Sequence, residues 1–585
     1  MREEHPRPEL VRENWLSLCG DWAFAFDFAR MGTEQYFFDE VQNRFAELAA
    51  QSFDRKIRVP FCPESELSGV NHTDFIGACM YKKSVCIPEG WEGRILLNFE
   101  AAFYETHVVV GGNYLGSHKG GYTPFSFDVT DCIQNGKADI FVYCLGDSRN
   151  PEQPSGKQAM VRYGKICMYT RCTGIWAPVW LECVPDVYVK SLETQADPDN
   201  GCVHARLAFG GNGNKDVTLR AFLHGKEVGN AAAHTTLNEL RVCLPLSETA
   251  LWSPDDPALY DLGIEVASGG KVDAVRSYFG LRKIEWDKHG LILNGKRLCL
   301  KMVLDQGYYP DGLYTAPDAL SFARDIALAQ ELGFNGARPH QKVFERRYLY
   351  ECDKRGFLVW GEYPDWGFDH SSSGALQVFL PEWLESVERD ISHPCVIGWC
   401  PQNETYMEIN GNKVRADFTR QVYLETKRRD PSRPCIDASG GVHFLTDWFD
   451  VHEYFQDTDE FAGYFGALEP GSNYAGDPDL PWFLSEYGGT WLREETATDD
   501  KKPDASSNAA PDEREFIRRF TAFADTLLSN PRVAGFCYTQ LYDVEQEKNG
   551  LYRFDRSPRF SEKALRAFRE ALSRPAASEK VSLVE

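Results

Sequence analysis

The sequence predicts a multidomain β plus α/β protein: an N-terminal jelly-roll β-sandwich, an immunoglobulin-like β-sandwich and a C-terminal (β/α)8 TIM barrel. The chain has 585 residues, more than the ~250–300 residues at which a single core stops growing. Short apolar runs separated by turn residues fill the first half of the chain. After about residue 283, apolar runs alternate with helical stretches instead, a pattern typical of α/β folds.

The two β domains are predicted from strand-length apolar runs. Residues 1–185 contain runs such as 94–99 (RILLNF) and 106–110 (THVVV), with turn residues between them, which favour a sandwich or jelly roll. Residues 186–282 continue with runs such as 218–223 (TLRAFL) and fit a small immunoglobulin-like sandwich.

Residues 283–585 form the predicted barrel. Its eight expected strands lie near 298–303, 334–337, 357–360, 396–399, 435–438, 449–454, 482–485 and 533–539. Its expected helices lie near 318–332, 343–355, 381–391, 412–428, 512–529 and 561–573. Eight strands in ~300 residues match a (β/α)8 barrel, although the fifth and sixth units show little helical pattern. No GxGxxG follows a strand, so a Rossmann sheet is the weaker alternative.

Charge and cysteine content restrict the partners. The net charge of −24 repels phosphate backbones, so neither nucleic acid nor an anionic membrane is an expected partner. The N-terminus has no apolar signal-peptide core, and no run of 18 apolar residues occurs. The 17 cysteines show no CxxC pair or zinc-module spacing, which favours a reduced compartment. We therefore expect a cytoplasmic protein.

Two carboxylates stand where a barrel carries its function. Glu404 follows the fourth predicted strand and Glu486 ends the seventh, and the C-terminal ends of barrel strands form the active face. A single carboxylate is more often a surface residue, but two across a sugar-sized opening can hydrolyse a glycoside. One protonates the leaving oxygen and the other attacks the anomeric carbon. A separation of about 5–5.5 Å would make the reaction retaining.

Neighbouring strand ends supply candidate binding residues. Arg338 and Tyr454 are expected to keep Glu486 ionised, and the charge of Glu486 to raise the pKa of Glu404. Asn403 is placed to bond a sugar 2-hydroxyl. The remaining candidates for sugar binding are His340, His452, Asp305, Glu362, Trp366, Tyr538 and Gln540. The histidines either bind hydroxyls or are satisfied polar residues, and Trp366 either stacks on a sugar or packs under the rim.

Motifs along nearly the whole chain resemble glycoside hydrolase family 2, the β-galactosidase, β-glucuronidase and β-mannosidase family. They are residues 16–22 (LSLCGDW), 120–128 (GGYTPFSFD), 174–182 (GIWAPVWLE), 251–260 (LWSPDDPALY), 393–404 (HPCVIGWCPQNE) and 481–488 (PWFLSEYG). The resemblance implies that Glu404 is the general acid/base and Glu486 the nucleophile of a retaining exo-glycosidase. It also implies a sugar-binding-like N-terminal domain, and β domains that buttress the barrel or form homo-oligomer contacts.

Two departures from the family concern the sugar. Family 2 glucuronidases clamp the uronate with an Asn-x-Lys pair, whereas this chain reads Glu547-Lys548-Asn549. Many relatives end strand eight with a tryptophan, where this chain has Thr539 or a neighbour. The default is a β-galactosidase-like activity. The alternatives are an α-L-arabinofuranoside, β-galactofuranoside, β-xyloside or β-glucuronide hydrolase, an endo-acting hydrolase, and a non-catalytic carbohydrate-binding protein.

The remaining expectations concern cofactors and one loop. The proposed chemistry requires no cofactor, and the sequence leaves open a bound Mg²⁺ or Na⁺ near the carboxylates. The partner is a carbohydrate or glycoside substrate. Residues 494–511 are polar, acidic and rich in Ala and Ser, which is typical of a solvated loop, with a flap over the site as the alternative.

Overall fold

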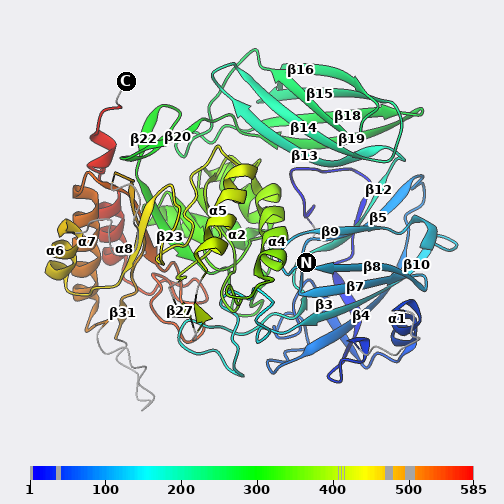
Figure 1. Cartoon of the computed structure of the whole chain (residues 1–585), viewed down its shortest axis with the longest axis horizontal. Helices are drawn as coiled ribbons and strands as arrows, with labels where there is room; N and C mark the ends of the chain where they lie inside the picture. The colour runs from blue at the N-terminus through cyan, green and yellow to red at the C-terminus, as the bar shows by residue number, and fades with distance from the viewer. Residues whose placement is uncertain are drawn as a thin grey trace.

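The structure is a computed structural model that describes residues 4–33, 41–405, 408–409, 412–413, 415–467, 479–493 and 508–583. Three domains follow one another along the chain (Figure 1). The N-terminal β-sandwich lies at the lower right of the view, the second β-sandwich at the top and the helix-covered barrel at the left. No helix in the described part of the chain is both long and apolar enough to cross a membrane.

Two antiparallel sheets form the first sandwich. One sheet has the order β1 (Trp15–Ser17), β12 (Val179–Val184), β5 (Arg94–Phe99), β9 (Phe125–Asp128). The other has the order β3 (Arg55–Val59), β2 (Gly20–Phe26), β4 (Gly77–Cys86), β10 (Lys137–Gly146), β7 (Glu105–Val110), β8 (Asn113–Lys119). Trp22, Leu97 and Val108 pack between the sheets. The helix α1 (Val41–Ala50) covers the outer face, where Phe45 stacks on Tyr114.

The second sandwich has seven strands in two sheets. They are β13 (Tyr188–Asp197), β14 (Cys202–Gly210) and β17 (Glu239–Pro245), facing β16 (Lys226–Thr235), β15 (Lys215–Leu223), β18 (Tyr260–Ser268) and β19 (Lys271–Phe279). Alternate residues of β15 are buried, as a sheet with one face on a core requires. Seven strands in two packed sheets agree with the predicted immunoglobulin-like architecture.

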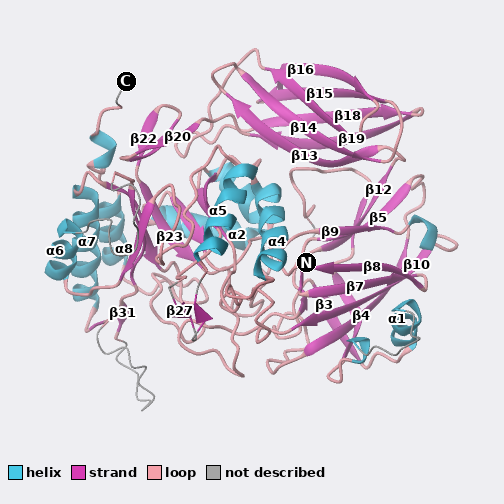
Figure 2. Ribbon diagram, viewed as in Figure 1, coloured by secondary structure: helices cyan, strands magenta, loops and turns pink. Residues whose placement is uncertain are grey.

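A short antiparallel meander leads into a curled parallel sheet (Figure 2). The meander is β20 (Ile284–Asp287), β21 (Gly290–Leu293) and β22 (Lys296–Leu298). The seven parallel strands are, in spatial order, β26 (Val396–Cys400), β25 (Leu358–Glu362), β24 (Gly336–Pro339), β23 (Leu300–Asp305), β33 (Val533–Thr539), β30 (Trp482–Gly488) and β29 (Phe449–Glu453). The helices of this domain are α2 (Ala319–Glu331), α3 (Arg346–Arg355), α4 (Ala375–Asp390), α5 (Ala416–Arg429), α6 (Thr458–Ala467), α7 (Glu513–Ser529) and α8 (Glu562–Leu572).

The fifth barrel unit differs from the prediction. Residues 435–438 form no regular strand; instead, Cys435 and Ser439 make isolated parallel bridges to β26 and the residue Asn403 that follows it. The cause is Asp437, whose carboxylate accepts hydrogen bonds from the backbone N–H groups of residues 438, 444 and 445. Side-chain bonds therefore replace part of the strand ladder at this position.

Two helices also differ. The sixth unit contains α6, which the sequence pattern did not predict. The helix α4 begins at Ala375, six residues before the predicted start at Pro381. A proline is favoured in the first turn of a helix, but here Pro381 lies on an exposed face inside α4.

Candidate active site

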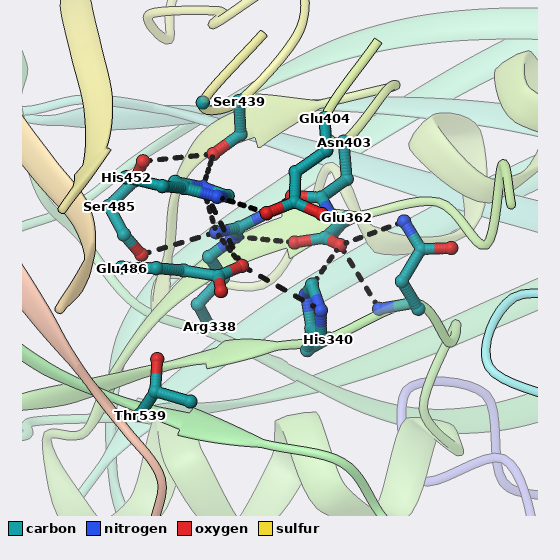
Figure 3. A network of polar contacts seen from close by, with 12 residues as sticks. Arg338, His340, Glu362, Asn403, Glu404, Ser439, His452, Ser485, Glu486 and Thr539 are labelled. Carbon is teal, nitrogen blue, oxygen red and sulfur yellow. Dashed lines mark hydrogen bonds and ion pairs between the residues drawn. The ribbon is translucent and has the colours of Figure 1, made fainter. Parts of the chain in front are cut away.

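Polar side chains from several barrel strands meet at one edge of the sheet (Figure 3). Arg338 lies on β24, Glu362 ends β25, His452 lies on β29 and Glu486 lies on β30. Asn403 and Glu404 follow β26. Because the C-terminal ends of parallel strands meet at one face, residues distant in sequence converge there.

Arg338 is the centre of this network. Its Nε donates to Glu362, its Nη2 donates to Oδ1 of Asn403 at 2.6 Å, and its Nη1 donates to Oε1 of Glu486 at 3.1 Å. The side chain is buried, with 1% exposure. A guanidinium presents its donors in a rigid fork, so one residue fixes the positions of three polar side chains.

Glu486 is buried between cations and a phenol. The hydroxyl of Tyr454 donates to Oε2, while Arg338 bonds Oε1. Nε2 of His452 lies 3.6 Å and Nε2 of His340 3.7 Å from Oε1. Burial raises the pKa of Glu486, but His452 foremost and Arg338 outweigh it and hold the pKa below its ordinary value. This carboxylate is therefore ionised at neutral pH, as a nucleophile must be.

Glu404 has a strained backbone and a histidine partner. Its φ of 50° lies in the left-handed region that L-residues rarely adopt, and its N–H donates to the carbonyl of Ser439 at 2.7 Å. Nδ1 of His452 lies 2.8 Å from Oε1 of Glu404. Strain of this kind is commonly found at functional sites.

The pKa of Glu404 differs from the prediction. The sequence predicts a raised pKa, but the structure lowers it: burial raises it, and the hydrogen bond and charge of His452 outweigh burial. Burial lowers the pKa of His452, but Glu486 and Glu404 raise it above its ordinary value. The two shifts favour a carboxylate at Glu404 and a protonated ring at His452.

The two glutamates are close together. Carboxylate oxygens of Glu404 and Glu486 and a ring nitrogen of His452 all lie within 4.8 Å of one another. Retaining glycosidases hold their carboxyl groups about 5–5.5 Å apart, and inverting ones about 6.5–9.5 Å. The geometry thus matches direct attack by one carboxylate.

Several polar residues behind the centre were not anticipated from the sequence. Ser439 and Ser485 both donate to Asp450, and Oγ of Ser439 lies 3.2 Å from Nε2 of His452. At Gly440, where φ is +63°, a Cβ would stand 2.3 Å from the His452 ring. Only glycine leaves room for the imidazole there. These residues lie on β29, on β30 and in the irregular fifth unit, where no single-sequence pattern marks them.

The other predicted site residues divide into two groups. Nδ1 of His340 lies 2.9 Å from Glu362, and Nε1 of Trp366 donates to the carbonyl of Asn403 at 3.1 Å, so both belong to the centre or its rim. Asp305 instead accepts hydrogen bonds from Tyr542 and Gly307.

Tyr538 and Gln540 also lie outside the centre. Tyr538 packs against Tyr487 and Phe520 of α7, on the helix side of β33, because side chains of a strand alternate between its two faces. Gln540 donates to Oδ1 of Asn549 at 2.7 Å. The predicted place of Tyr538 at the sugar is therefore corrected, while the predicted sugar-binding roles of Asp305 and Gln540 stay predictions.

Three groups of described residues have ligand atoms close enough to hold a metal ion. They are Cys202, His204 and Cys243; Asp353, His393 and Cys395; and Glu404, His452 and Glu486. In the second group His393 and Asp353 already pair at 2.6 Å, and the third consists of the two glutamates predicted to be catalytic and His452.

Two family models match the chain. Residues 15–155 match glycosyl hydrolases family 2, sugar binding domain, and residues 184–282 match glycosyl hydrolases family 2. The two β domains of this chain therefore match glycosyl hydrolases family 2 models, as the resemblance implies.

The proteins to which this chain is similar carry two activities in their names. It is 25% identical over 419 residues to a β-galactosidase of Thermoanaerobacter pseudethanolicus, covering 68% of the chain and 52% of the relative. It is 25% identical over 477 residues to a β-glucuronidase of Canis lupus familiaris, covering 74% of the chain and 69% of the relative. The matches span about half the length of the two β-galactosidases.

A solved structure shares the whole fold. The β-D-glucuronidase of Dictyoglomus thermophilum superposes with a TM-score of 0.76 at 20% identity, covering 98% of this chain and 99% of that one. Together with the family models, this likeness confirms the predicted fold class.

The family 2 departures can be located in the structure. Lys548 is exposed, while Asn549 is buried and donates to Glu547 at 3.1 Å. The hydroxyl of Thr539 lies 3.4 Å from that of Tyr454, next to Glu486. Residues 494–507, most of the segment predicted to be a solvated loop or a flap, lie outside the described residues. Residues 509–510 form β32, which pairs with β31 (Trp491–Leu492).

Proposed function

We propose that the protein is a retaining exo-glycosidase that releases a terminal non-reducing sugar by double displacement. The observation that carries the proposal is the spacing of Glu404 and Glu486, whose oxygens lie within 4.8 Å. This short approach of one oxygen from each carboxylate supports attack by a carboxylate, for which the carboxyl groups lie closer together than in an inverting enzyme.

In the first step Glu486 attacks the anomeric carbon. Arg338 and Tyr454 hold both of its oxygens and so orient the attacking lone pair. The Nδ2 atom of Asn403 is buried and has no hydrogen-bond partner among the described residues, although its Oδ1 is held by Arg338. This free donor is available to a sugar 2-hydroxyl, a contact that strengthens in the transition state.

Glu404 protonates the leaving oxygen. In the free protein the proton rests on His452, and the 2.8 Å contact lets it pass to Glu404 without rearrangement of either side chain. After Glu486 becomes a neutral ester, Glu404 takes a proton from water as the water oxygen attacks the anomeric carbon; the bond from that carbon to Glu486 breaks, which restores the carboxylate and releases the sugar. Every step uses protein side chains and water, so the proposal requires no cofactor.

The default substrate is a β-galactoside. The names of two relatives support it, as does the exposed Lys548, which is not directed into a clamp for a uronate. A β-glucuronide is the second candidate because other relatives are named β-glucuronidases. The same test includes the remaining alternatives, an α-L-arabinofuranoside, a β-galactofuranoside and a β-xyloside.

The test is a screen of aryl glycosides of these sugars with the wild-type protein, followed by NMR of the first-formed anomer. We expect turnover with retention, greatest for the β-galactoside. Inversion would contradict the mechanism. Sugar binding without turnover of any glycoside would favour the non-catalytic alternative, and cleavage within an oligosaccharide would favour endo action.

A further inference from the structure

A loop of the first domain reaches the mouth of the barrel. We call residues 155–170 the mouth loop. At one end, the N–H of Ser155 donates to the carbonyl of Trp366 at 3.0 Å. At the other end, Tyr169 donates to Glu547, and the N–H of Thr170 donates to Glu545 at 3.0 Å. The mouth loop therefore bridges the segments that follow β25 and β33.

The backbone fit of this loop is close at one position. The N–H of Gly156 donates to the carbonyls of Trp366 at 3.0 Å and Pro364 at 3.2 Å. Its φ is +58°, and a Cβ there would stand 2.2 Å from the carbonyl oxygen of Gln341. Only glycine allows this approach, so the position of the next residue, Lys157, is fixed by the barrel.

Lys157 places a charged group inside the mouth. The residue is 7% exposed, and its ammonium lies 5.5 Å from the centre of the Trp366 ring. The same tryptophan bonds the backbone of Asn403, the neighbour of Glu404. Burial lowers the pKa of Lys157, but Glu547 foremost, then Glu486 and Glu404, outweigh it, so the ammonium stays charged.

This ammonium has no acceptor of its own. Throughout the described part of the chain, no oxygen lies within hydrogen-bond or ion-pair distance of Nζ. A buried charge without a hydrogen-bonded partner is costly. An oxygen of a ligand bound beside Trp366 would supply the acceptor that this ammonium lacks among the described residues.

We propose that Lys157 is a substrate-binding residue, delivered by the first domain, that donates a hydrogen bond to a hydroxyl of a neutral sugar held at Glu404 and Glu486. The inference rests on the proposed function. A neutral hydroxyl is favoured over a carboxylate because the charges of Glu547, Glu486 and Glu404 already act on Lys157, and Lys548 is exposed.

The test compares Lys157→Met with Lys165→Met, an exposed lysine of the same mouth loop. On the best neutral aryl glycoside, we expect kcat/KM of Lys157→Met to fall about 10- to 100-fold, the effect of losing a hydrogen bond from a charged donor. We expect no drop in the melting temperature, because a methionine removes an unpaired buried charge. Lys165→Met should match the wild type. A purely structural role would instead lower the melting temperature.

A second measurement separates this inference from the proposed function. In a Glu486→Gln background, which cannot turn over substrate, the Kd of the same glycoside is measured by calorimetry with and without Lys157→Met. Weaker binding on loss of Lys157 supports the inference even if the wild type hydrolyses nothing. Unchanged Kd and kcat/KM would overturn it. It would also be overturned if the wild type prefers an aryl β-glucuronide and Lys157→Met removes only that preference.

Discussion

Nδ1 of His452 lies 2.8 Å from Oε1 of Glu404, so the proposed acid/base and a histidine of the sixth barrel unit share one hydrogen bond. Nε2 of the same ring lies 3.6 Å from Oε1 of Glu486. One imidazole thus responds to the charge of both carboxylates. The pair titrates as a unit rather than as two separate groups.

Replacing His452 by Asn should move the basic limb of the pH profile. The pKa of His452 is raised by Glu486 and Glu404, so the wild-type pair loses its last proton above the ordinary histidine value. Without the ring, only the carboxyl of Glu404 remains to hold that proton. We expect the basic limb of kcat/KM to shift to lower pH, measured with an aryl glycoside. An unchanged limb would contradict the shared-proton model.

Glu404→Gln and Glu486→Gln should differ in their dependence on the leaving group. General acid catalysis contributes about 10²–10⁴-fold, and a leaving group that needs no proton makes it dispensable. We expect Glu404→Gln to retain a burst of released aglycone from an activated aryl glycoside, and Glu486→Gln to release none. Stopped-flow absorbance gives the comparison. Equal loss in both variants would be evidence against the assigned roles.

Arg338→Met should damage both stability and activity. The guanidinium is buried against Glu362 and Glu486, and removing one partner of such a group costs about 3–5 kcal/mol in the free energy of unfolding. Arg94→Met breaks an exposed pair with Asp128 and should cost less than about 1 kcal/mol. Urea unfolding compares the two variants.

The same Arg338 variant has a pH signature. Arg338 helps to hold the pKa of Glu486 below its ordinary value, so its loss raises that pKa. We expect the acid limb of kcat/KM to move to higher pH. In the wild type, the depressed pKa stabilises the fold above the unfolded pKa of a glutamate, and the stabilisation is lost as the pH falls through the folded value.

Gly440→Ala should inactivate the enzyme beyond its effect on stability. A non-glycine residue in the left-handed region costs about 1–2 kcal/mol, and here the Cβ would also displace His452. Gly269 is a matched control, since its φ is +57° and no atom lies within 4 Å of a Cβ there. Thermal unfolding should show a similar backbone cost in both alanine variants. Only Gly440→Ala should lose kcat; equal kcat in the two would contradict the role of Gly440.

The sequence was sufficient to locate the barrel and its paired glutamates. Glu404 and Glu486 each follow an apolar run. The C-terminal ends of barrel strands converge at one face independently of the conformation of the connecting loops. Tyr538 was misplaced because a fully buried strand has no alternating pattern to show which face a side chain occupies. The prediction of a fifth strand at 435–438 was wrong because hydrogen bonds to the side chain of Asp437 replace backbone hydrogen bonds between strands. The strand propensity of the sequence contains no information about these side-chain bonds.

Lys157 shows a different limit of sequence reasoning. It belongs to a β domain and lies 148 residues before Asp305, the first barrel residue predicted at the site. Its approach to Glu404 and Glu486 depends on domain docking and on the close contact at Gly156. Neither has a signature in the periodicity of a single chain.

The docking of the mouth loop bears on how the protein acquires its activity during folding. A barrel that forms first would already contain Glu404 and Glu486, but Lys157 would be held beside Trp366 only once the bonds of Ser155 and Gly156 to Trp366 form. In a refolding time course, the return of hydrolysis should therefore lag behind the recovery of barrel tertiary structure. The rate at which hydrolysis returns would then report the rate at which the two domains associate.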